Sequence, residues 1–164
     1  MTPAQVARLV DTHAAALVLT ARQWCAEPED VVQEAFIKLV RQRPPPNDCV
    51  AWLYRVVRNG AIDVGKIARR RVRRESSVAR PERWFVEDEI DGLDAETAVA
   101  ALEQLAGEQR EVIVARHWGG LSFEQIADVV GCSASTAFRR YTAGVEELRK
   151  QMGVAICPKH SSNA

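Results

Sequence analysis

Long hydrophobic runs are missing from this sequence of 164 residues. No stretch approaches the roughly 18 consecutive apolar residues that a membrane-spanning helix requires. The opening segment, MTPAQVARLVDTHAAALVL, also lacks the basic start and the small-residue cleavage site of an export signal. We therefore expect a cytoplasmic protein with no membrane insertion.

Paired cysteines and a catalytic set are also missing. The cysteines stand singly at Cys25, Cys49, Cys132 and Cys157, with no C-x-x-C pair, which argues against a disulfide framework. Cys157 and His160 have a spacing that a metal could use, but a zinc site usually needs four ligands. His13 and His117 lie far from His160 and beside no acid or serine motif. We expect no enzyme activity, no metal and no cofactor.

Charge is balanced overall but unevenly distributed. The 22 basic and 22 acidic residues cancel, yet six cations fall within the nine residues 66–74. Such a run repels itself unless an anionic partner is present, which favours contact with a nucleic acid. The segment 76–94, SSVARPERWFVEDEIDGLD, follows it, and its acids, prolines and loss of periodicity predict a linker between two modules.

Apolar residues recur at three- and four-residue steps on both sides of this linker, which predicts helices. The expected helices cover about 3–24, 28–43 and 49–75, and two more follow the linker, separated near Gly107. The triple proline 44–46 ends the second helix, and Asn47 or Asp48 can cap the third. The apolar stripe of the third helix comprises Leu53, Val56, Val57, Ala61, Val64, Ile67 and Ala68. An all-α chain follows, and its 47% apolar content suffices for one core or two small ones.

A helix-turn-helix pattern occupies the stretch GLSFEQIADVVGCSASTAFRRY. Ser122 and Gln125 have the spacing of a capping box, Gly131 suits the sharp turn, and Ser133 can cap a second helix. The first half of that second helix would present hydroxyl groups and arginines to base edges and phosphates in a major groove. The alternative is a helical core element whose arginines are simply solvated.

Four segments together resemble a known family: PEDVVQEAFIKLVR, AWLYRVVRNGAIDVGKIARRR, EQREVIVARHWGGLSFEQIA and GCSASTAFRRYTAGVEELRK. They are similar to the bacterial RNA polymerase sigma factors of the extracytoplasmic-function (ECF) subfamily, within the sigma-70 family. The resemblance implies two small helical domains joined by a flexible acidic linker. Region 2 would cover 1–75, the linker 76–94, region 4 with its helix-turn-helix 95–152, and a tail 153–164.

The resemblance also implies a function and partners. The chain would be a promoter-specificity subunit that binds the β′ and β subunits of core RNA polymerase, recognises promoter DNA and helps to open it. In many relatives an anti-sigma factor is wedged between the two domains. The residues placed where the family docks on the β′ coiled coil are Asp30, Gln33, Glu34 and Phe36. For Asp30 and Glu34 the alternative is an ordinary solvated helix face.

Recognition and melting of the minus-ten element would fall to the third helix. By resemblance, Trp52, Asn59 and Asp63 border or brace a surface for an extruded base, a task suited to aromatic faces and nearby cations. The cations expected to follow phosphates are Lys66, Arg69, Arg70 and Arg73. Trp52 and Tyr54 are two residues apart and cannot share one helical face, so we expect one to meet DNA and the other to pack. The alternative for either is a place in the core alone. A hydrogen bond between Asn59 and Asp63 is the alternative for that pair.

Recognition of the minus-thirty-five element would fall to the second helix of the helix-turn-helix. The expected DNA-binding residues are Ser135, Thr136, Phe138, Arg139 and Arg140. The family usually has T-V-K-S-R where this chain reads TAFRR, so family promoter preferences do not transfer. Two alternatives stay open: a stand-alone helix-turn-helix regulator, which would leave PEDVVQEAF unexplained, and a sequestering protein-interaction module, against which the arginines of both modules count.

Overall fold

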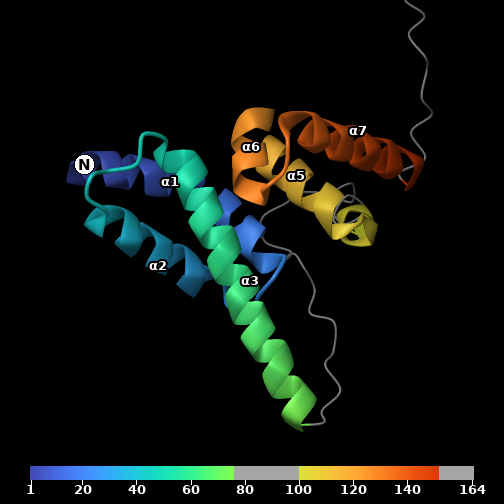
Figure 1. Ribbon diagram of the computed structural model, residues 1–164, viewed down its shortest axis with the longest axis horizontal. Coiled ribbons are helices and arrows are strands. Elements are labelled where there is room, and N and C mark those ends of the chain that lie inside the picture. Colours follow the sequence, from blue (N-terminus) through green and yellow to red (C-terminus); the bar gives the residue numbers. More distant parts are fainter. Residues whose placement is uncertain (76–99, 152–164) are drawn as a thin grey trace, which may run out of the picture.

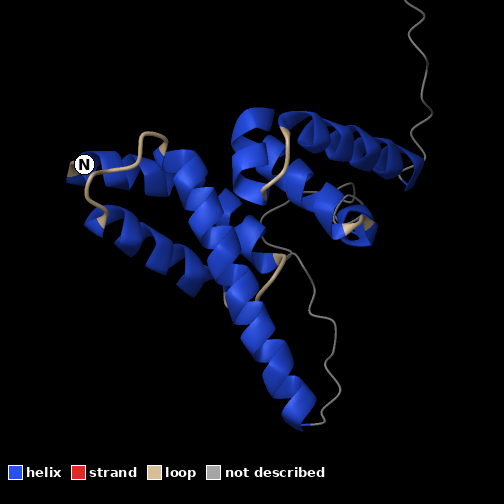
Figure 2. Ribbon diagram, in the orientation of Figure 1, coloured by secondary structure: helices blue, strands red, loops and turns tan. Residues whose placement is uncertain are grey.

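Helices joined by short loops make up the described part of the chain (Figures 1 and 2). The computed structural model describes residues 1–75 and 100–151. Its helices are α1 (Pro3–Arg22), α2 (Pro28–Arg41), α3 (Cys49–Glu75), α5 (Gly107–His117), α6 (Phe123–Val130) and α7 (Ala134–Gln151). Residues 100–104 are also helical, and neither range contains a strand. The all-α prediction is confirmed.

Side chains next to the helix ends explain several of these boundaries. The Thr2 hydroxyl accepts a hydrogen bond from the Gln5 backbone amide, and the Gln5 side chain accepts one from the Thr2 amide, which closes a capping box on α1. Pro28 opens α2, where a missing amide hydrogen has no cost. Asp48 accepts a hydrogen bond of 2.9 Å from the Ala51 amide and so caps α3. The cap expected at Asn47 or Asp48 is therefore Asp48.

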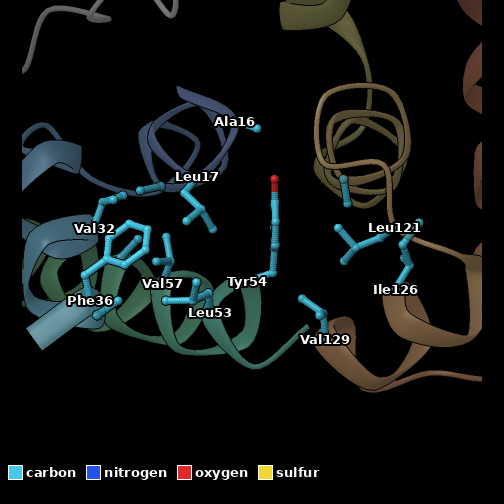
Figure 3. Close-up of a cluster of buried hydrophobic side chains, with 14 of the residues drawn as sticks. Ala16, Leu17, Val32, Phe36, Leu53, Tyr54, Val57, Leu121, Ile126 and Val129 are labelled. Atoms are coloured by element: carbon cyan, nitrogen blue, oxygen red, sulfur yellow. The ribbon is translucent and has the colours of Figure 1, made fainter. Parts of the chain in front are cut away.

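Helices α1, α2 and α3 pack into one bundle. Its core contains the fully buried side chains Leu17, Leu39, Leu53 and Val57. Val32 and Phe36 of α2 lie beside Leu17, Leu53 and Val57 in the same cluster (Figure 3). Burial in α1 begins only at Ala16, and Val10 in its first half is exposed. Val40 at the end of α2 is exposed as well. The bundle thus encloses the second half of α1 and most of α2.

Helices α5, α6 and α7 form a second bundle. Leu102, Leu105 and Ile113 make a small core there, packed against Tyr141, Val145 and Leu148 of α7. Gly131, with φ of 75°, ends α6 in the left-handed conformation that glycine adopts without strain, and its amide bonds the Ala127 carbonyl at 2.9 Å. The Ser122–Gln125 capping box is present at the other end of α6. The helix-turn-helix predicted from the sequence is therefore formed.

The two bundles share a continuous hydrophobic core. Tyr54 of α3 is completely buried and stands between Leu17 on one side and Leu121 on the other (Figure 3). Ile126 and Val129 of α6 belong to the same cluster. The sequence predicted two modules and left their relative placement open. In the structure they are in direct contact, with α6 packed against α3 and α5 against α1.

Polar contacts surround this shared core. Arg58 of α3 forms an ion pair with Glu111 of α5, and its second nitrogen lies 3.3 Å from the other carboxylate oxygen. The side chains are 20% and 6% exposed, so the pair is largely removed from water. At the start of α3, the Gln125 side-chain amide donates a hydrogen bond of 2.7 Å to Asp48. Charge and hydrogen-bond complementarity therefore add to apolar packing between the bundles.

The far half of α3 extends away from both bundles (Figure 1). Val64, Ile67 and Val72 are exposed there, although Val64 and Ile67 continue the apolar stripe of the first half. Ile67 is 65% exposed. The expected stripe is buried as far as Ala61. Beyond it Gly65 is still buried, beside the Trp24 carbonyl, whereas Val64 and Ile67 are exposed.

Candidate nucleic-acid interface

The outer face of α2 carries most of the residues expected to bind polymerase. Asp30, Gln33 and Glu34 are exposed, and Glu34 lies 3.7 Å from Lys38 one turn later. Phe36 points the other way: it is 9% exposed and belongs to the core of the first bundle. Ile37 is exposed and lies one turn after Gln33 and Glu34, where it places an apolar side chain that the sequence patterns did not indicate. The face therefore combines acidic, amide and apolar groups.

A groove of about 470 Å³ runs beside the start of α3. The loop prolines 44–46, Trp52 and Arg55 line it, and Asp128 of α6 closes one side. Trp52 is partly exposed toward this groove, whereas Tyr54 is buried, and burial raises the pKa of its phenol. Tyr54 is therefore the aromatic that packs, as expected for one of the two, and the contact of Trp52 with DNA stays a prediction.

Further along α3 the surface becomes basic. Asn59 and Asp63 are exposed, and Asp63 contacts Lys66 at 3.8 Å; no hydrogen bond between Asn59 and Asp63 is seen in the described structure. Arg69 is exposed and its Nε donates to the Gly65 carbonyl at 3.2 Å, while Arg70 is exposed next to it. Arg73 lies one turn beyond on the same helix. Groove and cations therefore follow one another along a single rigid helix.

The second basic surface lies on α7. Ser133 caps this helix, since its hydroxyl accepts from the Thr136 amide at 3.2 Å, and it lies within 3.0 Å of the Ser135 hydroxyl. Ser135, Phe138 and Arg139 are exposed, and Thr136 is partly exposed. A row of hydroxyl, aromatic and guanidinium groups thus faces outward from the first two turns.

Arg140 is placed differently from its neighbour. Its guanidinium pairs with Glu108 of α5 at 2.9 Å, and only 26% of its side chain is exposed. Arg139, by contrast, has its guanidinium 3.5 Å from the Thr136 hydroxyl on the outer face. The pair expected to act together on DNA is therefore divided between an outward arginine and one held against the neighbouring helix.

Comparison with known proteins identifies the two bundles. Residues 5–77 match the family model for Sigma-70 region 2, and residues 96–148 match the model for Sigma-70, region 4. The ECF RNA polymerase sigma factor SigL of Mycobacterium tuberculosis is 33% identical over 158 residues, which cover 89% of each chain. The chain belongs to the ECF RNA polymerase sigma factors. It is a promoter-specificity subunit, which binds core RNA polymerase and promoter DNA to start transcription.

A second relative and two solved structures agree with this assignment. The ECF sigma factor SigW of Bacillus subtilis is 30% identical over 141 residues, covering 77% of this chain and 75% of SigW. The sigma factor RpoE of Bartonella quintana, solved with the anti-sigma factor NepR, has a TM-score of 0.73 at 21% identity, covering 92% of this chain and 97% of RpoE. CnrH, solved with the cytosolic domain of CnrY, has a TM-score of 0.59 at 22% identity, with 94% and 92% covered. These two structures show the same fold.

The match to region 2 decides between the sequence-based alternatives. A stand-alone helix-turn-helix regulator needs only the second bundle. Residues 5–77 match a second sigma domain, which such a regulator would not require. What sequence patterns did not indicate in the sigma factor is the contact between regions, above all Arg58 with Glu111. These residues are 53 positions apart, and no local pattern connects them. The only sign of this contact in the sequence was that Arg58 falls next to the apolar positions of α3 that face the core.

Some predictions fall outside the described residues. The acidic linker 76–94 and the pair Cys157 and His160 are among them. Within residues 1–75 and 100–151 no group of three or more His, Cys, Asp or Glu side chains could hold a metal ion. In the same ranges no helix is long and apolar enough to cross a membrane.

Proposed function

We propose that the sigma factor divides promoter recognition between α3 and α7, with α2 as the docking face for polymerase. The observation that carries this division is the layout of α3, where an accessible tryptophan beside a groove is followed by exposed cations along one helix. Trp52, Asn59 and Asp63 would receive the minus-ten element, and Lys66, Arg69, Arg70 and Arg73 would bind its phosphates. Aromatic faces stack on unpaired bases, and cations bind the backbone beside them.

On α2, the proposed polymerase contacts are Asp30, Gln33 and Glu34. They are exposed on one side of the helix, and Phe36 holds that helix onto the bundle from the opposite side. In this proposal Phe36 is a positioning residue, and the apolar contact with polymerase comes from Ile37. A mixed polar and apolar helix face of this kind suits docking against another helix pair.

On α7, the proposed contacts with the minus-thirty-five element are Ser135, Thr136, Phe138 and Arg139. All four lie in the first two turns of the second helix of the helix-turn-helix, the part that enters a major groove. Arg140 would contact DNA only by leaving Glu108. Its proposed role is therefore a phosphate contact, which needs less precise placement than reading a base.

The remaining expectations form part of the same proposal. Region 2 would cover residues 1–75 and region 4 residues 95–152, close to the matched ranges 5–77 and 96–148. We propose that the protein works in the cytoplasm, where polymerase and DNA are, and leaves catalysis to the core enzyme. RpoE and CnrH were solved with NepR and CnrY, so an anti-sigma factor is a further proposed partner.

The test is run-off transcription with core RNA polymerase on a promoter library. The wild type should start transcripts from a shared two-part motif. Gln33→Ala with Glu34→Ala should lose polymerase binding, and Arg139→Ala with Arg140→Ala should lose upstream recognition while still binding polymerase. Arg149→Ala with Lys150→Ala removes the same charge from the exposed far end of α7 and should retain activity. Equal activity of all variants would contradict the proposed residue roles.

A further inference from the structure

Phe138 is exposed at the centre of the recognition surface. It lies in the second turn of α7 between Ala137, which is buried, and Arg139, and its side chain is 53% exposed. A phenylalanine in this position does not serve the core. It stands where the family usually has a lysine, so a donor of hydrogen bonds is replaced by an apolar ring. An apolar ring in place of a hydrogen-bond donor at position 138 predicts that α7 recognises a different base at the position it contacts.

We propose that Phe138 reads the 5-methyl group of a thymine in the upstream promoter element. The proposal rests on the function proposed for α7. In the major groove the thymine methyl is the apolar group that base edges present, whereas guanine, adenine and cytosine present donors and acceptors. A phenyl ring placed against those polar edges would leave them unpaired. Position 138 therefore selects thymine by contact and disfavours the other bases by desolvation.

The ring of Phe138 is held in place by other aromatic residues. It meets the Phe123 ring edge to face, at 5.3 Å between centroids and 89° between planes. Phe123 in turn contacts Tyr141 at 5.4 Å, and the Arg116 guanidinium lies 5.1 Å from its centroid. Edge-to-face pairs and cation contacts of this kind favour a single ring orientation. The exposed edge is therefore preorganised, and little side-chain freedom is lost when DNA binds.

The polar neighbours on this face are already engaged with one another. The Ser133 hydroxyl lies 2.9 Å from that of Thr136, and Arg139 reaches the same threonine at 3.5 Å. Arg140 is paired with Glu108. The Phe138 ring therefore differs from these polar groups. Within the described part of α5, α6 and α7 its ring contact is with Phe123, and its outer surface is left open to solvent.

The experiment measures one methyl group at a time. A duplex with a randomised upstream element is first selected with the complete sigma factor bound to core polymerase. In the selected sequence each thymine is then replaced by deoxyuridine, which removes only the methyl, and affinities are measured for the wild type, Phe138→Ala and Phe138→Leu. Run-off transcription from the same promoter is recorded in parallel, so that loss of promoter function is seen separately.

One thymine should stand out. Its replacement by deoxyuridine should weaken the wild-type complex about fourfold, the factor for one buried methyl group. The same replacement should leave Phe138→Ala unchanged, and Phe138→Leu should keep an intermediate response. The proposal is overturned if no thymine responds in a wild type that transcribes, or if Phe138→Ala responds as the wild type does, because the ring would then contact something else, such as a polymerase surface. A wild type that transcribes from no promoter would overturn the function of α7 as well.

Discussion

The two halves of α3 have the same helical pattern and opposite environments. From Cys49 to Ala61 the helix is enclosed by α1 and α2 on one side and by α6 on the other, and Tyr54 is completely buried. Beyond Ala61 the stripe continues with Val64 and Ile67, which are exposed. An amphipathic pattern therefore shows which face of a helix is apolar, while the length of the neighbouring helices decides how much of that face is covered.

The difference has a functional side. The enclosed half is held by packing against α1, α2 and α6, so the backbone that carries Trp52 beside the groove is fixed in position. Most of the free half is exposed, and within it Arg69 donates a hydrogen bond to the Gly65 carbonyl. Lys66, Arg69 and Arg70 are exposed along it. In the proposed division of roles, this one helix would carry both the base-binding groove and the phosphate-binding arm. Figure 1 shows its far half extending away from both bundles.

Truncation of an apolar side chain in each half gives the largest expected contrast. Tyr54→Ala should lower the free energy of unfolding by about 3–5 kcal/mol, because it leaves a large cavity between the bundles. Ile67→Ala should change it by less than about 0.5 kcal/mol, because the side chain already meets water. Urea denaturation followed by circular dichroism measures both. Similar destabilisation by the two substitutions would mean that the far half of α3 is covered in solution.

Removing the ion pair beside Tyr54 should have the next largest effect. Glu111→Ala leaves Arg58 partly buried without its partner, which should lower the free energy of unfolding by about 1–3 kcal/mol. Glu111→Gln keeps an acceptor of similar shape and should cost less. Small-angle scattering should show a larger radius for the alanine variant, since the pair joins the two bundles. An unchanged radius together with unchanged stability would contradict the proposed contribution of the pair.

Substitutions in the exposed far half of α3 should change DNA affinity and leave stability nearly unchanged. Arg69→Ala with Arg70→Ala should reduce the dependence of log affinity on log salt concentration by about 0.9 for each phosphate that is no longer neutralised. The free energy of unfolding should stay nearly constant, because both side chains are exposed. Fluorescence anisotropy of a labelled promoter duplex, titrated with salt, measures the slope. A weaker complex with an unchanged slope would indicate that these arginines bind bases instead of phosphates.

The smallest expected effect is a pH dependence at the junction. The hydrogen bond from Gln125 is the main cause that lowers the pKa of Asp48 below its ordinary value of 3.8. An acid with a lower pKa in the folded state stabilises the fold above its ordinary pKa, and the effect is lost as pH falls through the lowered value. Asp48→Asn keeps a helix cap and should remove this dependence, with a change of a few tenths of a kcal/mol because the site is exposed. Stability measured from pH 6 downward tests it.

Much of the local structure followed from the sequence. A cap at Asn47 or Asp48, the Ser122–Gln125 capping box, the turn at Gly131 and the burial of one member of the pair Trp52 and Tyr54 were all predicted from the sequence. Each depends on residues a few positions apart, where backbone geometry fixes the contact. The roles of the exposed residues on α2, α3 and α7 stay predictions that the experiments above test.

Contacts between distant segments could not be predicted in this way. In the sequence, Glu111 is one acidic residue within a predicted helix of the second module. Only the structure shows that it faces Arg58 of α3. The pairing of Arg140 with Glu108 likewise depends on how α5 lies against α7. Periodicity describes one helix at a time, whereas these pairings depend on the positions of two.

The close approach at Gly119 limits how the sigma factor can be recombined with its relatives. A Cβ added to Gly119 would collide with the Ala115 carbonyl oxygen and lie 2.8 Å from both the Leu121 side chain and the Tyr54 hydroxyl, so the loop before α6 has room only for glycine. A second bundle with a side chain at this position would need a different path for its own loop and a shift of the Tyr54 side chain, even if each half folds. Tyr54 and Gly119 are therefore best exchanged together when a chimera with a relative is built.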